Sequence, residues 1–301
     1  MTSLGIDLGG TKIEAQLYAS DFSLLDRHRV STPSGYDDLV AEMTQLIEWA
    51  RSKAEVTAIG VAAAGLVHPV TRHTFAANLP ISDRPFPDDI AQAAQTPITY
   101  LNDCHALAVS EAHFGAGKGQ PRVAAVVLGT GVGGGLVVDG DLAKGPSGLA
   151  GEIGHTAAPA DWHDKFGIPV PSCGCGQVGC IETYLSGPGL ARLAKAMTGQ
   201  SLTPAEVAGQ RRGEFAPVWQ AWCDLGATLL RHMVLMHDPD VIVLGGGLSQ
   251  TPGLVDDLTV QLQTKAIGNF PMPTLVLAEG GPTSGGRGAA YVAVSEAGYG
   301  S

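Results

Sequence analysis

The chain has 301 residues, 45% of them hydrophobic and 16% charged, so it can bury a core, and its length suggests two lobes. Its 18 basic and 29 acidic residues give a net charge of −11, which argues against a nucleic-acid partner and against an anionic membrane. The first residues carry no region typical of a secretory signal, and the longest apolar stretch, Val123 to Val138, is interrupted by glycines. We therefore expect a cytoplasmic protein without a membrane span.

Strand and helix patterns alternate in the first part of the chain, which is typical of an α/β protein. Short apolar runs predict strands at Leu4–Asp7, Ile13–Tyr18, Leu25–Val30, Val56–Ala62 and Ile98–Leu101. Apolar residues at helical spacing predict helices at Asp37–Lys53, Asp88–Gln95 and Ala106–Phe114.

A turn-rich segment, Gly115–Pro121, predicts a boundary, after which the opening pattern of strand, glycine turn and strand recurs. The second copy is the strand Arg122–Leu128, the glycine loop Gly129–Gly135 and the strand Leu136–Asp139. This repeat indicates a duplicated lobe with a cleft between the copies, where both turns offer backbone N–H groups to one ligand. Residues 140–180 show little regular pattern, and the elements expected after them are Phe215–His237, Val241–Leu244, Leu254–Ala266, Thr274–Leu277 and Gly288–Ala297.

Both glycine turns are suited to holding phosphate. In Asp7–Lys12 the glycines allow the backbone to approach phosphate oxygens, while Asp7 at a strand end is placed to hold Mg²⁺ through water. A plain hairpin with a Gly-Gly turn is the alternative. The second turn contains G-x-G-x-x-G at Gly129, Gly131 and Gly134, but a strand follows it instead of a helix, which argues against a dinucleotide-binding fold.

The pair Asn102-Asp103 follows a predicted strand and precedes a predicted helix. A carboxylate there is well placed to act as a base in a cleft. From position alone, a helix N-cap is the favoured alternative.

Three of the five cysteines, Cys173, Cys175 and Cys180, lie within one stretch of eight residues, in a glycine-rich loop. An odd number of cysteines in such a cluster favours a metal site over a disulfide framework. Three thiols and one imidazole are a usual structural zinc set, and His155 and His163 are both candidates for the fourth ligand. If His155 is that ligand, the metal loop brings Glu152 and Glu182 together, and such groups bind sugar hydroxyls. Solvated surface acids are the alternative for these two glutamates.

Taken together, these residues resemble the ROK family of repressors, open reading frames and sugar kinases, over nearly the whole chain. The matching segments are Asp7–Lys12, Asn102-Asp103, Gly129–Gly135, Glu152-Ile153-Gly154-His155, Cys173–Cys180 and Asp238-Pro239-Asp240 with the glycines after it. The resemblance implies a duplicated ribonuclease-H-like α/β fold of the actin and hexokinase type, two-lobed with an interlobe cleft. We expect an N-terminal lobe at 1–117, joined by a C-terminal helix from about 287 to 301, and a C-terminal lobe at 118–286 that carries the zinc loop.

The resemblance implies ATP-dependent phosphorylation of a hexose, with a role for each matching residue. Asp103 is expected to be the base that takes the proton of the sugar 6-hydroxyl. The sugar ligands it implies are Asn78, Asn102, Asp103, Glu152, His155 and Glu182. The residues it implies for ATP and Mg²⁺ are Asp7, Gly9, Gly10, Thr11, Lys12, Gly129, Thr130, Gly131, Gly133, Gly245, Gly246 and Gly247. For a structural Zn²⁺ it implies His155, Cys173, Cys175 and Cys180, with His163 less favoured than His155.

Within the family, the chain is most similar to bacterial N-acetylglucosamine kinases. The features that carry this likeness are Phe75–Pro80, Cys180–Gly187 and the long step from His155 to Cys173. Three departures stand against it: Cys104-His105 after the aspartate, Thr183 (which matches manno- and fructokinases) and Ala63-Ala64-Gly65. A manno-, fructo- or glucokinase is therefore the alternative within the family.

A sugar-responsive regulator without kinase activity is the alternative from a different class. A repressor of this family needs a helix-turn-helix before the first strand, and the glycine motif here already begins at Asp7. We expect the partners to be a small sugar and ATP, and the assembly to be a homodimer as is common in the family.

Overall fold

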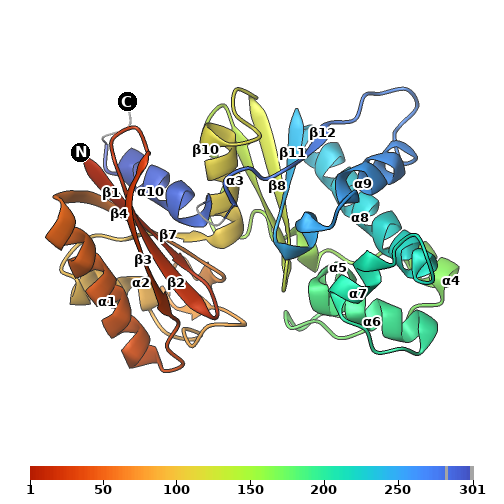
Figure 1. The fold of residues 1–301 in the computed structure, drawn as a ribbon, viewed down its shortest axis with the longest axis horizontal. Coiled ribbons are helices and arrows are strands. Elements are labelled where there is room, and N and C mark those ends of the chain that lie inside the picture. The colour runs from red at the N-terminus through yellow and green to blue at the C-terminus, as the bar shows by residue number, and fades with distance from the viewer. Residues whose placement is uncertain (282–283, 299–301) are drawn as a thin grey trace. The chain divides into compact units, whose positions relative to one another are not determined.

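The computed structural model describes residues 1–281 and 284–298 (Figure 1). Its contacts divide the chain into two compact units. Unit 1 comprises residues 1–118, 135–150 and 279–301, and unit 2 comprises residues 119–134 and 151–278. The sequence places the boundary near 117, and the contacts place it at 118 with residues 135–150 included in unit 1.

Unit 1 is built on a five-stranded sheet in the order β3-β2-β1-β4-β7. Its strands are β1 (Thr2–Leu8), β2 (Lys12–Tyr18), β3 (Leu24–Ser31), β4 (Val56–Ala63) and β7 (Thr99–Asn102). β1 pairs antiparallel with β2 and parallel with β4, and β4 pairs parallel with β7. All five strands agree with the sequence prediction to within a few residues.

Two layers of helices cover the two faces of this sheet. Helix α1 (Tyr36–Lys53) buries an apolar stripe against Leu4 and Ile6 of β1. The intervening Gly5 faces the other way, since strand side chains alternate, and it meets helix α10 (Ser284–Glu296). A Cβ at Gly5 would lie 1.9 Å from the Gly286 carbonyl oxygen, so only glycine permits this close approach. The remaining elements are α2 (Phe86–Ala93), α3 (Asp103–Phe114) and the short pair β5 (Leu66–Val67) and β6 (Thr74–Phe75).

The second sheet has the order β10-β9-β8-β11-β12. Its strands are β8 (Arg122–Leu128), β9 (Val132–Val138), β10 (Asp141–Leu142), β11 (Val241–Gly245) and β12 (Thr274–Leu277). β11 pairs parallel with both β8 and β12, just as β4 pairs with β1 and β7. This shared order is the structural form of the duplication that the repeated glycine turns predict.

The helices of unit 2 lie on both sides of the cysteine loop, Cys173–Cys180, in the chain. They are η1 (Ile153–His155), α4 (Ala160–Phe166), α5 (Glu182–Leu185), α6 (Gly187–Thr198), α7 (Pro204–Gly209), α8 (Ala216–His237), η2 (Gly247–Gln250) and α9 (Leu254–Gln263). The long α8 buries Trp222 and Leu225 in the core of this unit.

Two sequence expectations need correction. The loop expected at Gly129–Gly135 is shorter, because β9 already begins at Val132. Glycine occurs within this strand because close packing leaves no room for a side chain: a Cβ at Gly134 would lie 2.7 Å from the Ala125 carbonyl oxygen. The segment expected to lack regular structure contains helix α4, whose Trp162 is buried and donates to the Ala221 carbonyl at 3.0 Å. That contact spans 59 residues and leaves no local sequence signal.

No helix within residues 1–281 and 284–298 is both long enough and apolar enough to span a lipid bilayer.

Candidate functional site

The first glycine turn connects β1 and β2 in unit 1. It is closed by a 3.0 Å hydrogen bond from the Gly9 N–H to the Lys12 carbonyl, and Thr32 donates its hydroxyl to the Gly9 carbonyl at 2.6 Å. Gly10, Thr11 and Lys12 are exposed. The turn therefore presents backbone N–H groups, a hydroxyl and a cation to solvent, as a phosphate cradle requires.

Two acidic residues of unit 1 have shifted pKa values. Burial raises the pKa of Asp7 to about 6, with smaller contributions from the charges of Asp103 and Glu14 and an opposing one from Lys12. Burial also raises the pKa of Asp103. A raised pKa makes a carboxylate a stronger base, and such shifts cluster at functional sites.

Asn102 and Asp103 lie where β7 ends and α3 begins. Asn102 is the N-cap of α3, and its side chain accepts a hydrogen bond from the Cys104 N–H at 2.9 Å. Asp103 is the first residue of the helix, three residues before the predicted start, and its Oδ1 accepts from the same N–H at 2.9 Å. The capping interpretation is therefore right for Asn102. The same N–H is therefore shared by Asn102 and by Oδ1 of Asp103.

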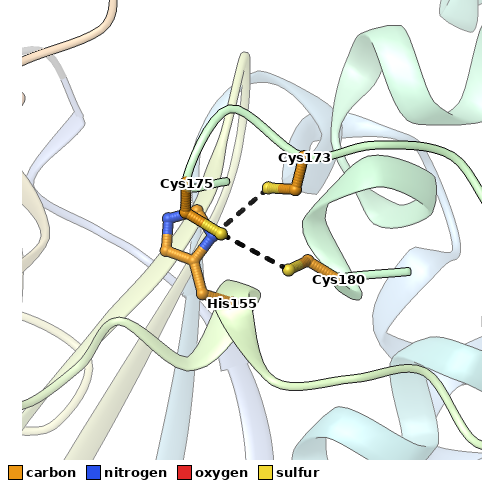
Figure 2. A group of neighbouring side chains, drawn as sticks. All are labelled: His155, Cys173, Cys175 and Cys180. Carbon is orange, nitrogen blue, oxygen red and sulfur yellow. Dashed lines mark hydrogen bonds between the residues drawn. The ribbon is translucent and has the colours of Figure 1, made fainter. Parts of the chain in front are cut away.

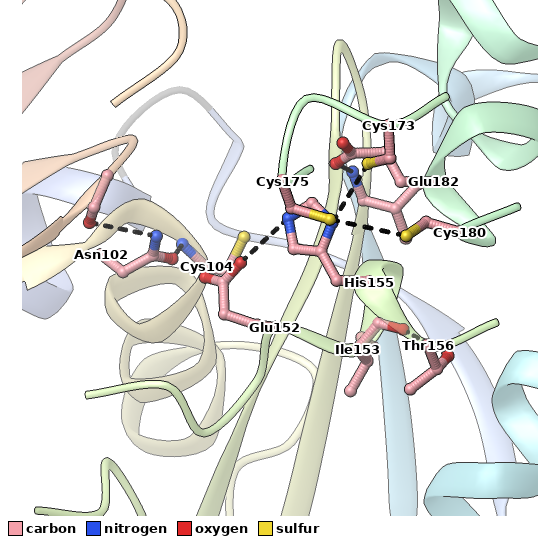
Figure 3. Close-up of polar contacts among 12 residues, drawn as sticks. Asn102, Cys104, Glu152, Ile153, His155, Thr156, Cys173, Cys175, Cys180 and Glu182 are labelled. Atoms are coloured by element: carbon pink, nitrogen blue, oxygen red, sulfur yellow. Dashed lines mark hydrogen bonds and ion pairs between the residues drawn. The ribbon is translucent and has the colours of Figure 1, made fainter. Parts of the chain in front are cut away.

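Asn102 and Asn78, the two predicted sugar-binding asparagines of unit 1, have different surroundings. The Asn102 side chain donates to the Gly65 carbonyl at 3.5 Å (Figure 3). Gly65 has a φ of +135°, and a Cβ there would lie 2.8 Å from the Phe75 carbonyl, so this position requires glycine. Asn78 is exposed, and its backbone lies next to the glycine turn, because a Cβ at Gly10 would be 3.2 Å from the Asn78 carbonyl oxygen.

The second glycine turn connects β8 and β9 and is fixed by Glu182. The Glu182 carboxylate accepts a hydrogen bond from the Val132 N–H at 2.9 Å. A Cβ at Gly131 would lie 2.8 Å from the same carboxylate oxygen, so a side chain there would displace the Glu182 carboxylate. The Gly129 N–H closes the turn on the Gly131 carbonyl at 3.0 Å, and the Gly187 N–H binds the Gly129 carbonyl at 2.8 Å. Glu182 thus connects the glycine turn to the segment that follows the metal loop.

A hollow of about 1040 Å³ lies beside this turn, entirely within unit 2. Its volume is at the upper end of the range for small-molecule sites. It is lined by Gly129, Thr130, Gly187, Pro188, Thr203, Pro204, Ala205, Ala208, Gly209, Arg211, Gly247, Leu248, Gln250, Thr251 and Pro252.

Gly246 directly precedes Gly247, which lines this hollow. Its φ is +85°, and a Cβ there would lie 2.4 Å from the Leu128 carbonyl oxygen. A side chain would therefore meet both backbone strain and a direct clash. Gly133 and Gly245, by contrast, lie within strands β9 and β11 and do not line the hollow.

The four predicted zinc ligands lie together, although their segments are up to 25 residues apart in the chain (Figure 2). One ligand atom from each of His155, Cys173, Cys175 and Cys180 lies within 4.8 Å of the others. His155 Nδ1 is 3.5 Å from Cys173 Sγ, and Cys175 Sγ is 3.6 Å from Cys180 Sγ. A tetrahedral zinc with Zn–S distances of about 2.3 Å needs ligand atoms about 3.8 Å apart. The donor set and its spacing therefore fit zinc.

The cysteines of the cluster have shifted pKa values, raised for Cys173 and Cys180 and lowered for Cys175. Burial and the neighbouring thiols raise the pKa of Cys180 to about 12. Burial raises the pKa of Cys173 as well. Only a bound cation would hold these thiols as thiolates at neutral pH, which is the form that binds metal.

His155 connects the cluster to a carboxylate (Figure 3). While Nδ1 faces Cys173, Nε2 lies 3.5 Å from Glu152 Oε2. His163 is engaged elsewhere: its Nδ1 lies 3.1 Å from the Ile168 carbonyl oxygen and its Nε2 lies 3.5 Å from the Tyr184 hydroxyl. Of the two histidines left open by the sequence, the structure gathers His155 with the cysteines.

The sequence interpretation does not identify most of the residues around the hollow. The stretch from Thr203 to Arg211 forms one wall of it, and helix α7 within that stretch starts with a capping box between Thr203 and Glu206. The T-x-x-E pattern was available as a helix-start signal. Nothing in the sequence, however, shows that this helix faces the second glycine turn.

The family model for ROK proteins matches residues 3–296. The chain belongs to the ROK family. A ROK glucokinase from Streptomyces griseus, solved in complex with glucose and AMPPNP, superposes with a TM-score of 0.80 at 28% identity, covering 98% of this chain and 100% of that one. The duplicated α/β fold of the actin and hexokinase type is therefore that of the ROK family.

Two curated ROK relatives are kinases of acetamido sugars. The N-acetylgalactosamine kinase AgaK of Shewanella sp. is 37% identical, over 96% of this chain and 95% of that protein. The N-acetyl-D-glucosamine kinase of Pectobacterium atrosepticum is 35% identical, over 96% of this chain and 97% of that protein.

Proposed function

We propose that this ROK protein is an ATP-dependent sugar kinase that phosphorylates the 6-hydroxyl of N-acetyl-D-glucosamine. The observation that carries the proposal is the Asp103 carboxylate, which starts helix α3 at a strand end and has a pKa raised by burial. Its placement and raised pKa suit a base that, in its ionised form, accepts the proton of a hydroxyl as that hydroxyl attacks phosphorus. The relatives named above are kinases of this class.

The protein performs phosphoryl transfer mostly by positioning. Asn78 and Asn102 in unit 1 and Glu152, His155 and Glu182 in unit 2 orient the sugar hydroxyls. Asp103 accepts the proton from the 6-hydroxyl late in the step.

The nucleotide is held by backbone groups of both glycine turns. Gly129, Thr130, Gly131 and the loop at Gly247 hold ATP in the unit 2 hollow, and Gly9 to Lys12 approach its phosphates. Mg²⁺ held near Asp7 supplies charge neutralisation of the phosphates. The hollow and its glycines support this assignment.

A structural Zn²⁺ held by His155, Cys173, Cys175 and Cys180 completes the proposal. Four protein ligands leave no open position, so this metal takes no part in the transfer. With Nδ1 on the metal side, the ring holds Nε2 toward Glu152, where a sugar hydroxyl can bind both groups. The homodimer and the cytoplasmic location expected from the sequence remain predictions.

The substrate is tested by ADP release with Mg-ATP against a panel of hexoses and zinc-replete protein. The panel comprises N-acetylglucosamine, N-acetylgalactosamine, N-acetylmannosamine, glucose, mannose and fructose. Preference for N-acetylglucosamine by kcat/KM supports the proposal, and preference for N-acetylgalactosamine retains the acetamido class but changes the sugar. Preference for mannose or fructose transfers the assignment to another branch, with Thr183 the first residue to examine. No turnover on any sugar favours a regulator without kinase activity.

A further inference from the structure

The chain passes between the two units at four places: after residues 118, 134, 150 and 278. These crossings lead directly to residues of the proposed site. The crossing after 134 follows the second glycine turn, and the crossing after 150 lies two residues before Glu152. Contacts that hold the chain in place on the unit 1 side of a crossing therefore also restrain the second glycine turn and the segment that leads to Glu152.

Glu111 holds two of the four crossings. It lies on α3, is 0% exposed, and its carboxylate accepts four hydrogen bonds. Oε2 accepts from the N–H groups of Ala116 at 3.0 Å and Glu279 at 2.9 Å. Oε1 accepts from the Gly280 N–H at 2.8 Å and the Ser284 hydroxyl at 3.0 Å. One buried side chain thus holds both the segment before residue 118 and the segment after residue 278.

The packing around this carboxylate shows that its place is specific. A Cβ at Gly115 would lie 2.1 Å from Glu111 Oε2, and a Cβ at Gly280 would lie 2.9 Å from Oε1. Both crossing segments therefore carry glycine where they meet the carboxylate. The backbone carbonyl of Glu111 also accepts from the N–H groups of Gly115 at 3.2 Å and Gly117 at 3.0 Å.

The other two crossings meet the same helix. The buried His105 ring donates from Nε2 to the Ala150 carbonyl, at the crossing after 150. Gly135, the first residue after the crossing at 134, packs on α3 so closely that a Cβ there would lie 2.7 Å from the Ala108 Cβ. His105, Ala108 and Glu111 follow one another at intervals of three residues, so consecutive members adjoin on the helix surface.

We propose that Glu111 is a positioning residue for phosphoryl transfer. Its carboxylate holds the segments at the chain crossings against α3, the helix whose first residue is Asp103. This inference rests on the proposed function. Because transfer depends on in-line geometry, loosening the crossings misaligns the reacting groups in the transition state, and errors of about 1 Å cost about 10²-fold in rate. Ground-state binding of sugar and of ATP is expected to change much less.

The test replaces Glu111 by glutamine, with Glu279→Gln as the matched control. Glu111→Gln keeps the shape but leaves one acceptor oxygen for four donors, and the introduced amide faces two of those donors with its own N–H groups. Glu279 uses only its backbone N–H in this cluster and is exposed, so its substitution makes the same chemical change without touching the carboxylate. Ser284→Ala, which removes one donor, serves as a milder variant if Glu111→Gln folds poorly.

Two readouts separate positioning from plain stability, both on zinc-replete protein well below its melting temperature. In Glu111→Gln we expect kcat to fall at least ~30-fold with both KM values within ~3-fold of wild type. We also expect hydrogen exchange at the amides of Ala116, Glu279 and Gly280 to accelerate at least ~10-fold, since their acceptors are lost. Ser284→Ala should change both readouts in the same direction by less, and Glu279→Gln should match wild type.

Wild-type kcat in folded Glu111→Gln overturns the proposal, as does unchanged exchange at the three amides. An equal loss in Glu279→Gln overturns it too, because that loss would not come from the carboxylate. Failure of the proposed function would be seen differently, as absence of transfer by the wild-type protein on every sugar of the panel.

Discussion

Replacing Asp7 by asparagine tests whether the site stores an unfavourable buried charge. Asp7 lies on β1 between Glu14 of β2 and Ala62 of β4. Burial and the charges of Asp103 and Glu14 raise its pKa from 3.8 to about 6. At 1.36 kcal/mol for each pH unit, this rise corresponds to ~3 kcal/mol of free energy. The folded protein therefore disfavours the ionised Asp7, in return for a carboxylate near the phosphate turn.

The sign of the effect follows from proton linkage. Because the pKa is higher in the folded state than in the unfolded state, the folded state binds more protons between pH 4 and pH 6. The contribution of Asp7 to stability is therefore complete below pH 4 and is lost as the pH rises through about 6. The asparagine of Asp7→Asn cannot ionise. The free energy of unfolding of this variant, relative to that of wild type, should therefore rise by up to ~3 kcal/mol between pH 4 and pH 7.5.

The assay is urea unfolding of both proteins at pH 4, 5, 6 and 7.5, without added magnesium. Asp141→Asn is the control, because Asp141 is an exposed residue of unit 1, on β10. Groups that do not interact with Asp7 titrate alike in both proteins and cancel in their difference, so the pH dependence that remains comes from Asp7 and from the charges coupled to it, Asp103 and Glu14. The same Asp7→Asn protein should lose kinase activity, which is the usual exchange of stability for function at such sites. A difference in stability that stays constant across this pH range would refute the reasoning.

Two further substitutions test unit 2. Cys180→Ser removes a ligand of the metal cluster, so we expect zinc content well below one per chain by mass spectrometry and a raised sugar KM, whereas Cys223→Ser, buried in α8, should keep its zinc. Full zinc in Cys180→Ser would contradict the assignment. Gly246→Ala introduces a Cβ 2.4 Å from the Leu128 carbonyl at φ +85°, so we expect ~1–3 kcal/mol lower stability and weaker binding of an ATP analogue by calorimetry. Gly247→Ala, with nothing within 4 Å, should be as stable as wild type, and equal stability of the two variants would contradict this account.

Local sequence signals predicted the features that depend on neighbouring residues. Short apolar runs predicted the strands from β1 to β12, apart from the two-residue strands β5, β6 and β10 and the true start of β9 at Val132. The spacing of Cys173, Cys175 and Cys180 predicted a metal cluster, and the structure gathers those three thiols with His155. A short spacing is informative because residues that are close in the chain are also close in space.

Features made by distant contacts left no such signal. The wall of the hollow from Thr203 to Arg211 faces a turn that lies more than 70 residues earlier in the chain. Three of the four donors to the Glu111 carboxylate lie 168 to 173 residues away, so the sequence alone shows only a glutamate in a helical pattern. Helix α4 depends in the same way on the hydrogen bond from Trp162 to Ala221. In each case tertiary structure, not local pattern, gives the residue its role.

The central claim is that Asp103 is the base in phosphoryl transfer to a sugar hydroxyl. The most direct measurement is ADP release by wild type and Asp103→Asn with saturating Mg-ATP and N-acetylglucosamine, beside calorimetric binding of that sugar. We predict that kcat falls at least ~10²-fold in Asp103→Asn, as expected for loss of a general base, while the sugar still binds. Near-normal turnover in Asp103→Asn would contradict the account.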